Sequence, residues 1–205
     1  MFAVGSLFLT GCPKHEVIPA PVEEVTLNAE FTGDISGATV YLKQGVQGYY
    51  LDVNKSKVIL PAPSPSSAVY YSDMKSGQTM VSVKVSLGSV LFDAATSSDQ
   101  NPTLEQLNNF LTANLTPSYS AGAVSGFEVV YRDAVGKIWT SDETFTPQDV
   151  EFTSLVQESD ASGDYFKYIC TFNCDVFHTE LDQFGNPVTY QLPIQNAVLK
   201  GWFKR

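Results

Sequence analysis

Residues 165–179 read YFKYICTFNCDVFHT, and apolar or aromatic side chains occupy almost every second position. One face of an extended chain would carry Phe166, Tyr168, Cys170, Phe172, Cys174, Val176 and His178. The other face is mixed and mostly polar. Alternation with this composition predicts a strand that buries one face. Because fifteen residues exceed the usual strand length, we expect it to bend or to cross most of a sheet.

Shorter segments with strand composition recur along the rest of the chain. They are residues 25–31, 38–43, 49–53, 57–60, 69–72, 79–87, 127–132, 137–141, 150–157, 188–192 and 197–203. About a dozen strands at this spacing predict an all-β fold, an antiparallel β-sandwich or barrel-like sheet built of hairpins.

One helix is expected, over residues 102–114. Thr103 and Gln106 have the spacing of a capping box, and Pro102 suits a first helical turn. An apolar face formed by Leu104, Leu107, Phe110 and Leu111 indicates that the helix packs on the sheet or against a barrel end.

Length and charge narrow the class of protein. A chain of 205 residues fits one domain with a short leader. Charged residues make up 17% of the chain and the formal net charge is -10. Because such a surface repels phosphate backbones, we expect no nucleic-acid partner.

The first residues form an apolar stretch that ends in Leu9-Thr10-Gly11-Cys12. This tetrapeptide resembles the bacterial lipobox, and the stretch before it resembles a secretory signal. The resemblance implies that residues 1–11 are a signal peptide and that Cys12 carries acyl chains that anchor the protein in a membrane. The alternative is an unmodified cysteine in a signal that is cleaved elsewhere. Proline-rich residues 12–24 then predict a tether, and residues 25–205 a single β domain.

The sequence contains none of the common enzyme signatures, GxSxG, HExxH, GxGxxG or a phosphate-binding loop. Cys170 and Cys174 would lie roughly 13 Å apart in a straight strand, which is too far for a disulfide. They are therefore expected to be small buried hydrophobic residues. We predict no catalytic residues and no cofactor, although carboxylates assembled only by folding leave a hydrolase open as a third alternative.

Two polar clusters are weak candidates for a metal site. His178, Glu180 and Asp182 alternate at the end of the long strand, where a solvated sheet edge is the favoured interpretation. Asp160 and Asp164, with Ser162 between them and Glu158 before them, lie in an oxygen-rich turn that does not match an EF-hand. The prediction is no metal at either place.

Aromatic residues are the remaining functional signal. Adjacent tyrosines on a strand point to opposite faces, so one of each pair, Tyr49-Tyr50 and Tyr70-Tyr71, is expected to face outward. Exposed aromatic rings stack on sugars and anchor protein interfaces. The candidate ligand-binding residues are Tyr50, Tyr71, Trp139 and Trp202. The favoured alternative is that these rings pack within the fold.

Together, the lipobox, the tether and the hairpin sequence GFEVVYRDAVGKIWTS resemble small outer-membrane lipoproteins of Bacteroidota. The resemblance implies an outer-membrane location, on the periplasmic or cell-surface side. We expect a non-enzymatic interaction or accessory module for another envelope protein. The alternative is a glycan- or small-ligand-binding lipoprotein that uses exposed aromatic side chains.

Overall fold

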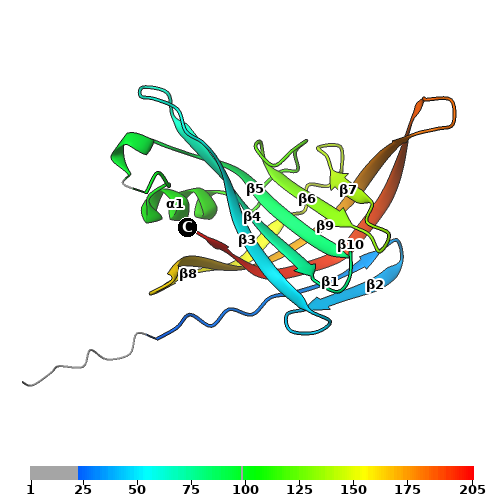
Figure 1. Cartoon of the computed structure of the whole chain (residues 1–205), viewed down its shortest axis with the longest axis horizontal. Coiled ribbons are helices and arrows are strands. Elements are labelled where there is room, and N and C mark those ends of the chain that lie inside the picture. Colours follow the sequence, from blue (N-terminus) through cyan, green and yellow to red (C-terminus); the bar gives the residue numbers. More distant parts are fainter. Residues whose placement is uncertain (1–22, 98) are drawn as a thin grey trace, which may run out of the picture.

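The computed structural model describes residues 23–97 and 99–205, which form one curled antiparallel sheet with a single α-helix among them. The sheet bends into a half-barrel (Figure 1). The all-β, barrel-like fold is therefore confirmed. Its strands are β1 (Glu30–Ile35), β2 (Ala38–Lys43), β3 (Tyr49–Val58), β4 (Ser66–Ser76), β5 (Ser82–Phe92), β6 (Phe127–Arg132), β7 (Ile138–Ser141), β8 (Glu151–Asp160), β9 (Gly163–Leu181) and β10 (Pro187–Lys204).

The long strand β9 lies near the middle of this sheet. The strand order is β2-β1-β10-β9-β7-β6-β5-β4-β3, and β8 pairs with the first half of β9. One edge of β9 therefore pairs with β8 and then with β7, whereas the other edge pairs with β10 along almost its whole length. The prediction that this segment crosses most of the sheet is confirmed.

The concave side of the sheet is a packed hydrophobic core. Its largest fully buried side chains include Phe31, Phe127, Phe166, Phe172 and Phe203. The curl of the sheet also brings the end of β10 against β4, where the Ser72 hydroxyl donates a hydrogen bond of 2.6 Å to the Trp202 carbonyl. This hydrogen bond joins the β4 side of the half-barrel to its β10 side.

Helix α1 (Leu104–Ala113) begins and packs as the sequence predicts. Thr103 and Gln106 form both hydrogen bonds of the capping box. Leu107 and Leu111 are buried against the sheet. A short 3-10 helix (Ala94–Thr96) precedes α1. Within the described ranges, no helix has the length and apolar character needed to cross a membrane.

Several strand boundaries differ from the sequence prediction; the strand predicted at 69–72 runs from Ser66 to Ser76, and the one predicted at 79–87 runs from Ser82 to Phe92. The first strand begins at Glu30 instead of residue 25, because two backbone nitrogens before it bond to side chains, Val25 to Asp160 and Ala29 to Gln44. The segments predicted at 49–53 and 57–60 belong mostly to one strand, β3. Likewise, 188–192 and 197–203 form the single strand β10, which passes through an irregularity between Ile194 and Ala197.

Candidate functional site

A polar hollow lies on the outer surface of β4, β5 and β6 and extends to β7. Side chains alternate along a strand, so the burial of Met74, Val85 and Val129 in the core directs their neighbours outward. The hollow has a volume of about 320 Å³. We call it the β4–β6 hollow; its polar lining is Asp73, Ser82, Lys84, Glu128, Arg132 and Thr140. A smaller hollow of about 180 Å³, which includes Asn54 and Tyr71, shares Asp73 and Lys84 with it.

The carboxylates of this hollow lack close partners among the described residues. Glu128 is only 9% exposed, and burial is the main cause that raises its pKa. Burial likewise raises the pKa of Asp73, and one of its oxygens, Oδ1, is buried without a hydrogen bond. The charge of Lys84 partly opposes both shifts. Neither Lys84 nor Arg132 forms one of the ion pairs found in the described part of the chain.

Ser86 adds a second buried polar atom without a partner, next to the hollow. It stands opposite Tyr71 on β4 and opposite Glu128 on β6. The residue is 1% exposed, and its hydroxyl has no hydrogen-bond partner among the described residues. Buried polar groups in native proteins nearly always have a partner, so a cluster without partners is a candidate binding site.

The aromatic ring nearest this cluster belongs to Tyr71. The Lys84 ammonium lies over the Tyr71 ring, 5.2 Å from its centre. Burial raises the pKa of the Tyr71 hydroxyl, which therefore stays protonated and can donate a hydrogen bond at neutral pH. The hollow thus combines hydrogen-bond acceptors, donors and one ring, an arrangement suited to holding a ligand.

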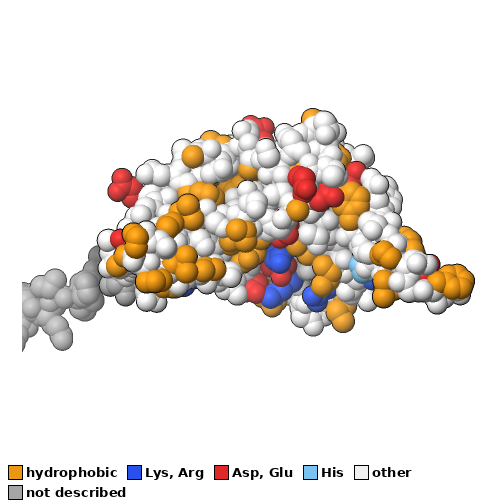
Figure 2. Space-filling view, turned by 90° about the horizontal axis from the view of Figure 1, so that it is seen from above, with side chains coloured by type: hydrophobic (Ala, Val, Ile, Leu, Met, Phe, Trp, Pro, Cys, Tyr) orange, Lys and Arg blue, Asp and Glu red, His pale blue; other side chains and the backbone are white. Residues whose placement is uncertain are grey.

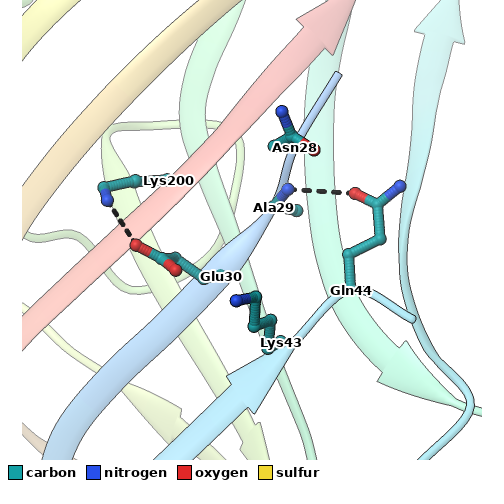
Figure 3. A pocket seen from close by; sticks show the side chains of 6 residues that line it. All are labelled: Asn28, Ala29, Glu30, Lys43, Gln44 and Lys200. Carbon is teal, nitrogen blue, oxygen red and sulfur yellow. Dashed lines mark hydrogen bonds and ion pairs between the residues drawn. The ribbon is translucent and has the colours of Figure 1, made fainter. Parts of the chain in front are cut away.

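A second hollow lies between β1, β2 and β10, and Glu30, Lys200 and Gln44 of its lining have partners within it (Figure 3). Its volume is about 310 Å³. Glu30 forms an ion pair with Lys200, and this hydrogen bond is the main cause that lowers the pKa of the carboxyl. Gln44 accepts a hydrogen bond of 2.9 Å from the nitrogen of Ala29. These contacts hold the start of β1 in place, so the function of this hollow is structural.

Of the weak metal candidates at the end of β9, His178 and Glu180 approach each other, with Nε2 3.5 Å from Oε2, but Asp182 does not join them. The His178 Nδ1 atom lies 2.8 Å from the carbonyl oxygen of Ile138. Glu180 pairs with Lys137 at 3.0 Å. Asp182 closes the following turn by accepting hydrogen bonds from the nitrogens of Phe184 and Asn186. In the described ranges, no three metal-ligating side chains gather in a geometry that could hold an ion.

The two aspartates of the β8–β9 turn also have structural partners. Asp160 accepts hydrogen bonds from the nitrogens of Val25 and Ser162, and the Ser162 hydroxyl is the main cause that lowers its pKa to about 2. Asp164 accepts a hydrogen bond from Ser159 and lies 3.4 Å from Arg205. These contacts fasten the segment before β1 and the C-terminus to the turn.

The structure separates the four aromatic residues proposed to bind ligand. Tyr50 is 46% exposed on β3 with Lys75 over its ring, whereas Tyr71 is half-buried beside the β4–β6 hollow. The indole N–H of Trp139 donates a hydrogen bond to the Asp133 carboxylate. Trp202 is 6% exposed and belongs to the core, so its ring is not available to a ligand. As predicted, one tyrosine of each adjacent pair faces the core.

Sequence reasoning missed every residue that lines the β4–β6 hollow, including Asp73 and Glu128, and also Ser86 next to it. Their alternation with core residues marks them as outward-facing, as in Phe127-Glu128-Val129. The signal that was available is a polar residue flanked by strongly buried ones. Nothing in the sequence indicates how deeply neighbouring strands cover these groups.

Cys170 and Cys174 are free and buried in the core, and burial raises the pKa of both thiols. The expectation that they are small buried residues is confirmed. The proposed lipidation residue, Cys12, lies outside the described residues. In comparisons with known proteins, no family model, curated protein or solved structure matches this chain.

Proposed function

We propose that the protein is a non-enzymatic interaction module, held at the outer membrane by lipid on Cys12, that binds another envelope protein. The observation that carries the proposal is a projecting hairpin, residues 178–190, which we call the β9–β10 arm (Figure 1). Phe177 is the last residue of β9 that pairs with β7. Beyond it, β9 and β10 continue as a two-stranded ribbon.

The arm exposes apolar side chains that its own fold does not require. Phe184 is 78% exposed and Leu181 is 69% exposed. Hydrophobic side chains cover the tip of the molecule at the right-hand end of Figure 2. The turn is fixed by Asp182 and by Gly185, whose φ of 85° suits glycine. Because Phe184 is not needed for the turn, its ring is available to fill a pocket on a partner.

The base of the arm is braced against the neighbouring hairpin. The Lys137 ammonium pairs with Glu180 at 3.0 Å and lies over the Tyr190 ring at 5.8 Å from its centre. A braced contact element loses less conformational freedom when it binds. This contact therefore favours a function in recognition for the arm.

The position of the arm fits a partner protein better than the anchoring membrane. Residue 23, where the described chain begins, lies at the opposite end of the long axis from the arm (Figure 1). The bond from the Val25 nitrogen to Asp160 attaches this segment to the β8–β9 turn. A tether that enters there directs the arm away from the bilayer. We therefore infer that the partner is a protein with an apolar pocket.

The test is a native pull-down of the tagged full-length protein from membranes in mild detergent, with partners identified by mass spectrometry. Phe184→Ser should reduce recovery of a stoichiometric partner at least ten-fold, as expected for an anchor residue. The matched control is Val58→Ser, at a residue of β3 that is 56% exposed, and it should leave recovery unchanged. Finding no partner, or equal losses in both variants, would overturn the proposal.

A further inference from the structure

We propose that the β4–β6 hollow is a second binding site, independent of the arm, for a neutral polyhydroxylated ligand such as an oligosaccharide. The reason is that several of its buried polar groups have no hydrogen-bond partner. Asp73 Oδ1 and Ser86 Oγ are buried without partners, and Glu128 is nine-tenths buried with neither a hydrogen bond nor an ion pair to a described residue. A ligand that hydrogen-bonds these groups would replace the hydrogen bonds to water that they lose on burial.

Asp73 Oδ1 and Ser86 Oγ are two of the four buried side-chain atoms that lack a hydrogen-bond partner in the described chain. The remaining two are the hydroxyls of Tyr70 and Tyr168, and both residues are at most 3% exposed within the core. Neither of these tyrosines lines the β4–β6 hollow. Asp73 and Glu128 instead line the outer hollow of about 320 Å³, and Ser86 stands opposite Glu128 in the strand register.

The charges of the hollow favour a neutral ligand. Its lining contains two acidic residues, Asp73 and Glu128, and two basic residues, Lys84 and Arg132. Lys84 stands directly opposite Asp73 in the strand register, where it would repel a metal cation. The two carboxylates would in turn repel a phosphate. A ligand with many hydroxyls can donate to the carboxylates and accept from the basic side chains without carrying charge.

The size and shape of the site fit more than one sugar ring. The hollows of about 320 and 180 Å³ meet at Asp73 and Lys84. Small-molecule sites begin at about 300 Å³, so the larger hollow alone reaches that range. The smaller hollow adds Tyr71, whose aromatic face can pack against the C–H face of a sugar. An extended disaccharide lying across β4 and β5 would occupy both.

The test uses ¹⁵N-labelled full-length protein in a detergent without a sugar headgroup, titrated with cellobiose, maltose, lactose, mannobiose and N,N′-diacetylchitobiose. We expect at least one of them to shift amide signals of β4, β5 and β6 in a saturable way. Glu128→Gln and Asp73→Asn should each weaken that binding about ten-fold or more, because each removes a charged acceptor. The amide spectrum of each variant reports at the same time whether it is folded.

The matched control is Glu30→Gln in the hollow of Figure 3, where the carboxylate already has a partner. It should leave the affinity within two-fold of the parent protein. The zwitterion glycylglycine is titrated in parallel. The proposal is overturned if none of the disaccharides gives a saturable shift, if only glycylglycine gives one, or if Glu30→Gln weakens binding as much as Glu128→Gln. Because the arm is not involved, Phe184→Ser should bind the sugar normally, so the two proposals can fail separately.

Discussion

The two outer hollows have nearly equal volumes, about 310 and 320 Å³, but their glutamates are in opposite states. Glu30 is paired with Lys200, and its pKa is lowered. Glu128 is buried without a close partner, and its pKa is raised. Both hollows contain lysine as well as glutamate, so composition does not explain the difference.

Strand register accounts for the difference between the two glutamates, although not for Asp73, which stands opposite Lys84 without forming an ion pair. Glu30 stands directly opposite Lys200 across β1 and β10, the arrangement in which opposite charges on neighbouring strands pair. Glu128 stands opposite Ser86, whose short side chain offers no counter-charge. One hollow is thus closed by its own side chains, whereas the other keeps its hydrogen-bonding groups available. This contrast is the basis for assigning a structural function to one and binding to the other.

The largest expected effects on the free energy of unfolding come from core residues beneath the two hollows. There the two regions should respond alike, because both are fully packed. Met74→Ala beneath the β4–β6 hollow and Leu199→Ala beneath the other each remove a fully buried side chain. Each should lower the free energy of unfolding by about 2–5 kcal/mol, because a cavity remains. Chemical denaturation measures both.

A small effect for Met74→Ala beside a large one for Leu199→Ala would contradict the comparison. It would mean that β4, β5 and β6 are loosely packed. The unsatisfied groups above them would then reflect local disorder of the sheet and not a site.

Much of this fold could be predicted from local sequence pattern. Alternation located the long strand β9, and capping chemistry located α1 through Thr103 and Gln106. The start of β1 was predicted wrongly, because the nitrogen of Val25 bonds to a carboxylate 135 residues away. The burial of Trp202 likewise depends on the curl that brings β10 against β4. Such contacts between distant segments leave no periodic signal in the sequence.

The candidate site was hidden for the same reason. Alternation reveals that Asp73 and Glu128 face outward, but not that neighbouring strands bury them there. Ser86 resembles any outward serine of a strand until its register with Tyr71 and Glu128 is known. Sequence reasoning placed only Tyr71 near the site, from the argument about adjacent tyrosines.

A smaller effect should appear in the pH dependence of stability. Because the pKa of Glu128 is raised in the folded protein, its ionised carboxylate lowers the folding stability. This loss of stability is fully present above the folded pKa and disappears as pH falls toward 4.5, the ordinary value. Because the pKa of Glu30 is lowered in the folded protein, its ionised carboxylate stabilises the fold. This stabilisation is fully present above pH 4.5 and is lost as pH falls through the folded pKa. At pH 7, Glu128→Gln should therefore stabilise the protein by about 1–2 kcal/mol. Glu30→Gln should destabilise it by at most about 1 kcal/mol.

Urea denaturation of both variants and the parent protein between pH 4 and pH 8 measures these differences. The two variants should deviate from the parent protein in opposite directions at pH 7. The deviation of Glu128→Gln should shrink as pH falls toward 4.5, whereas that of Glu30→Gln should begin to shrink only below 4.5. Loss of stability in Glu128→Gln at pH 7 would mean that this carboxylate has a stabilising partner in solution.

The smallest expected effects come from two buried serines that differ only in whether the hydroxyl is bonded. Ser72 and Ser86 are 0% and 1% exposed, and Ser72 donates to the Trp202 carbonyl whereas Ser86 has no partner among the described residues. Ser72→Ala should lower the free energy of unfolding by about 1 kcal/mol, and Ser86→Ala should raise it by up to about 1 kcal/mol. Both substitutions delete the same atom at the same depth, so denaturation curves compare them directly. If Ser86→Ala destabilises as much as Ser72→Ala, a bound water already satisfies the Ser86 hydroxyl. The β4–β6 hollow would then lose one of the three groups that a sugar is expected to satisfy.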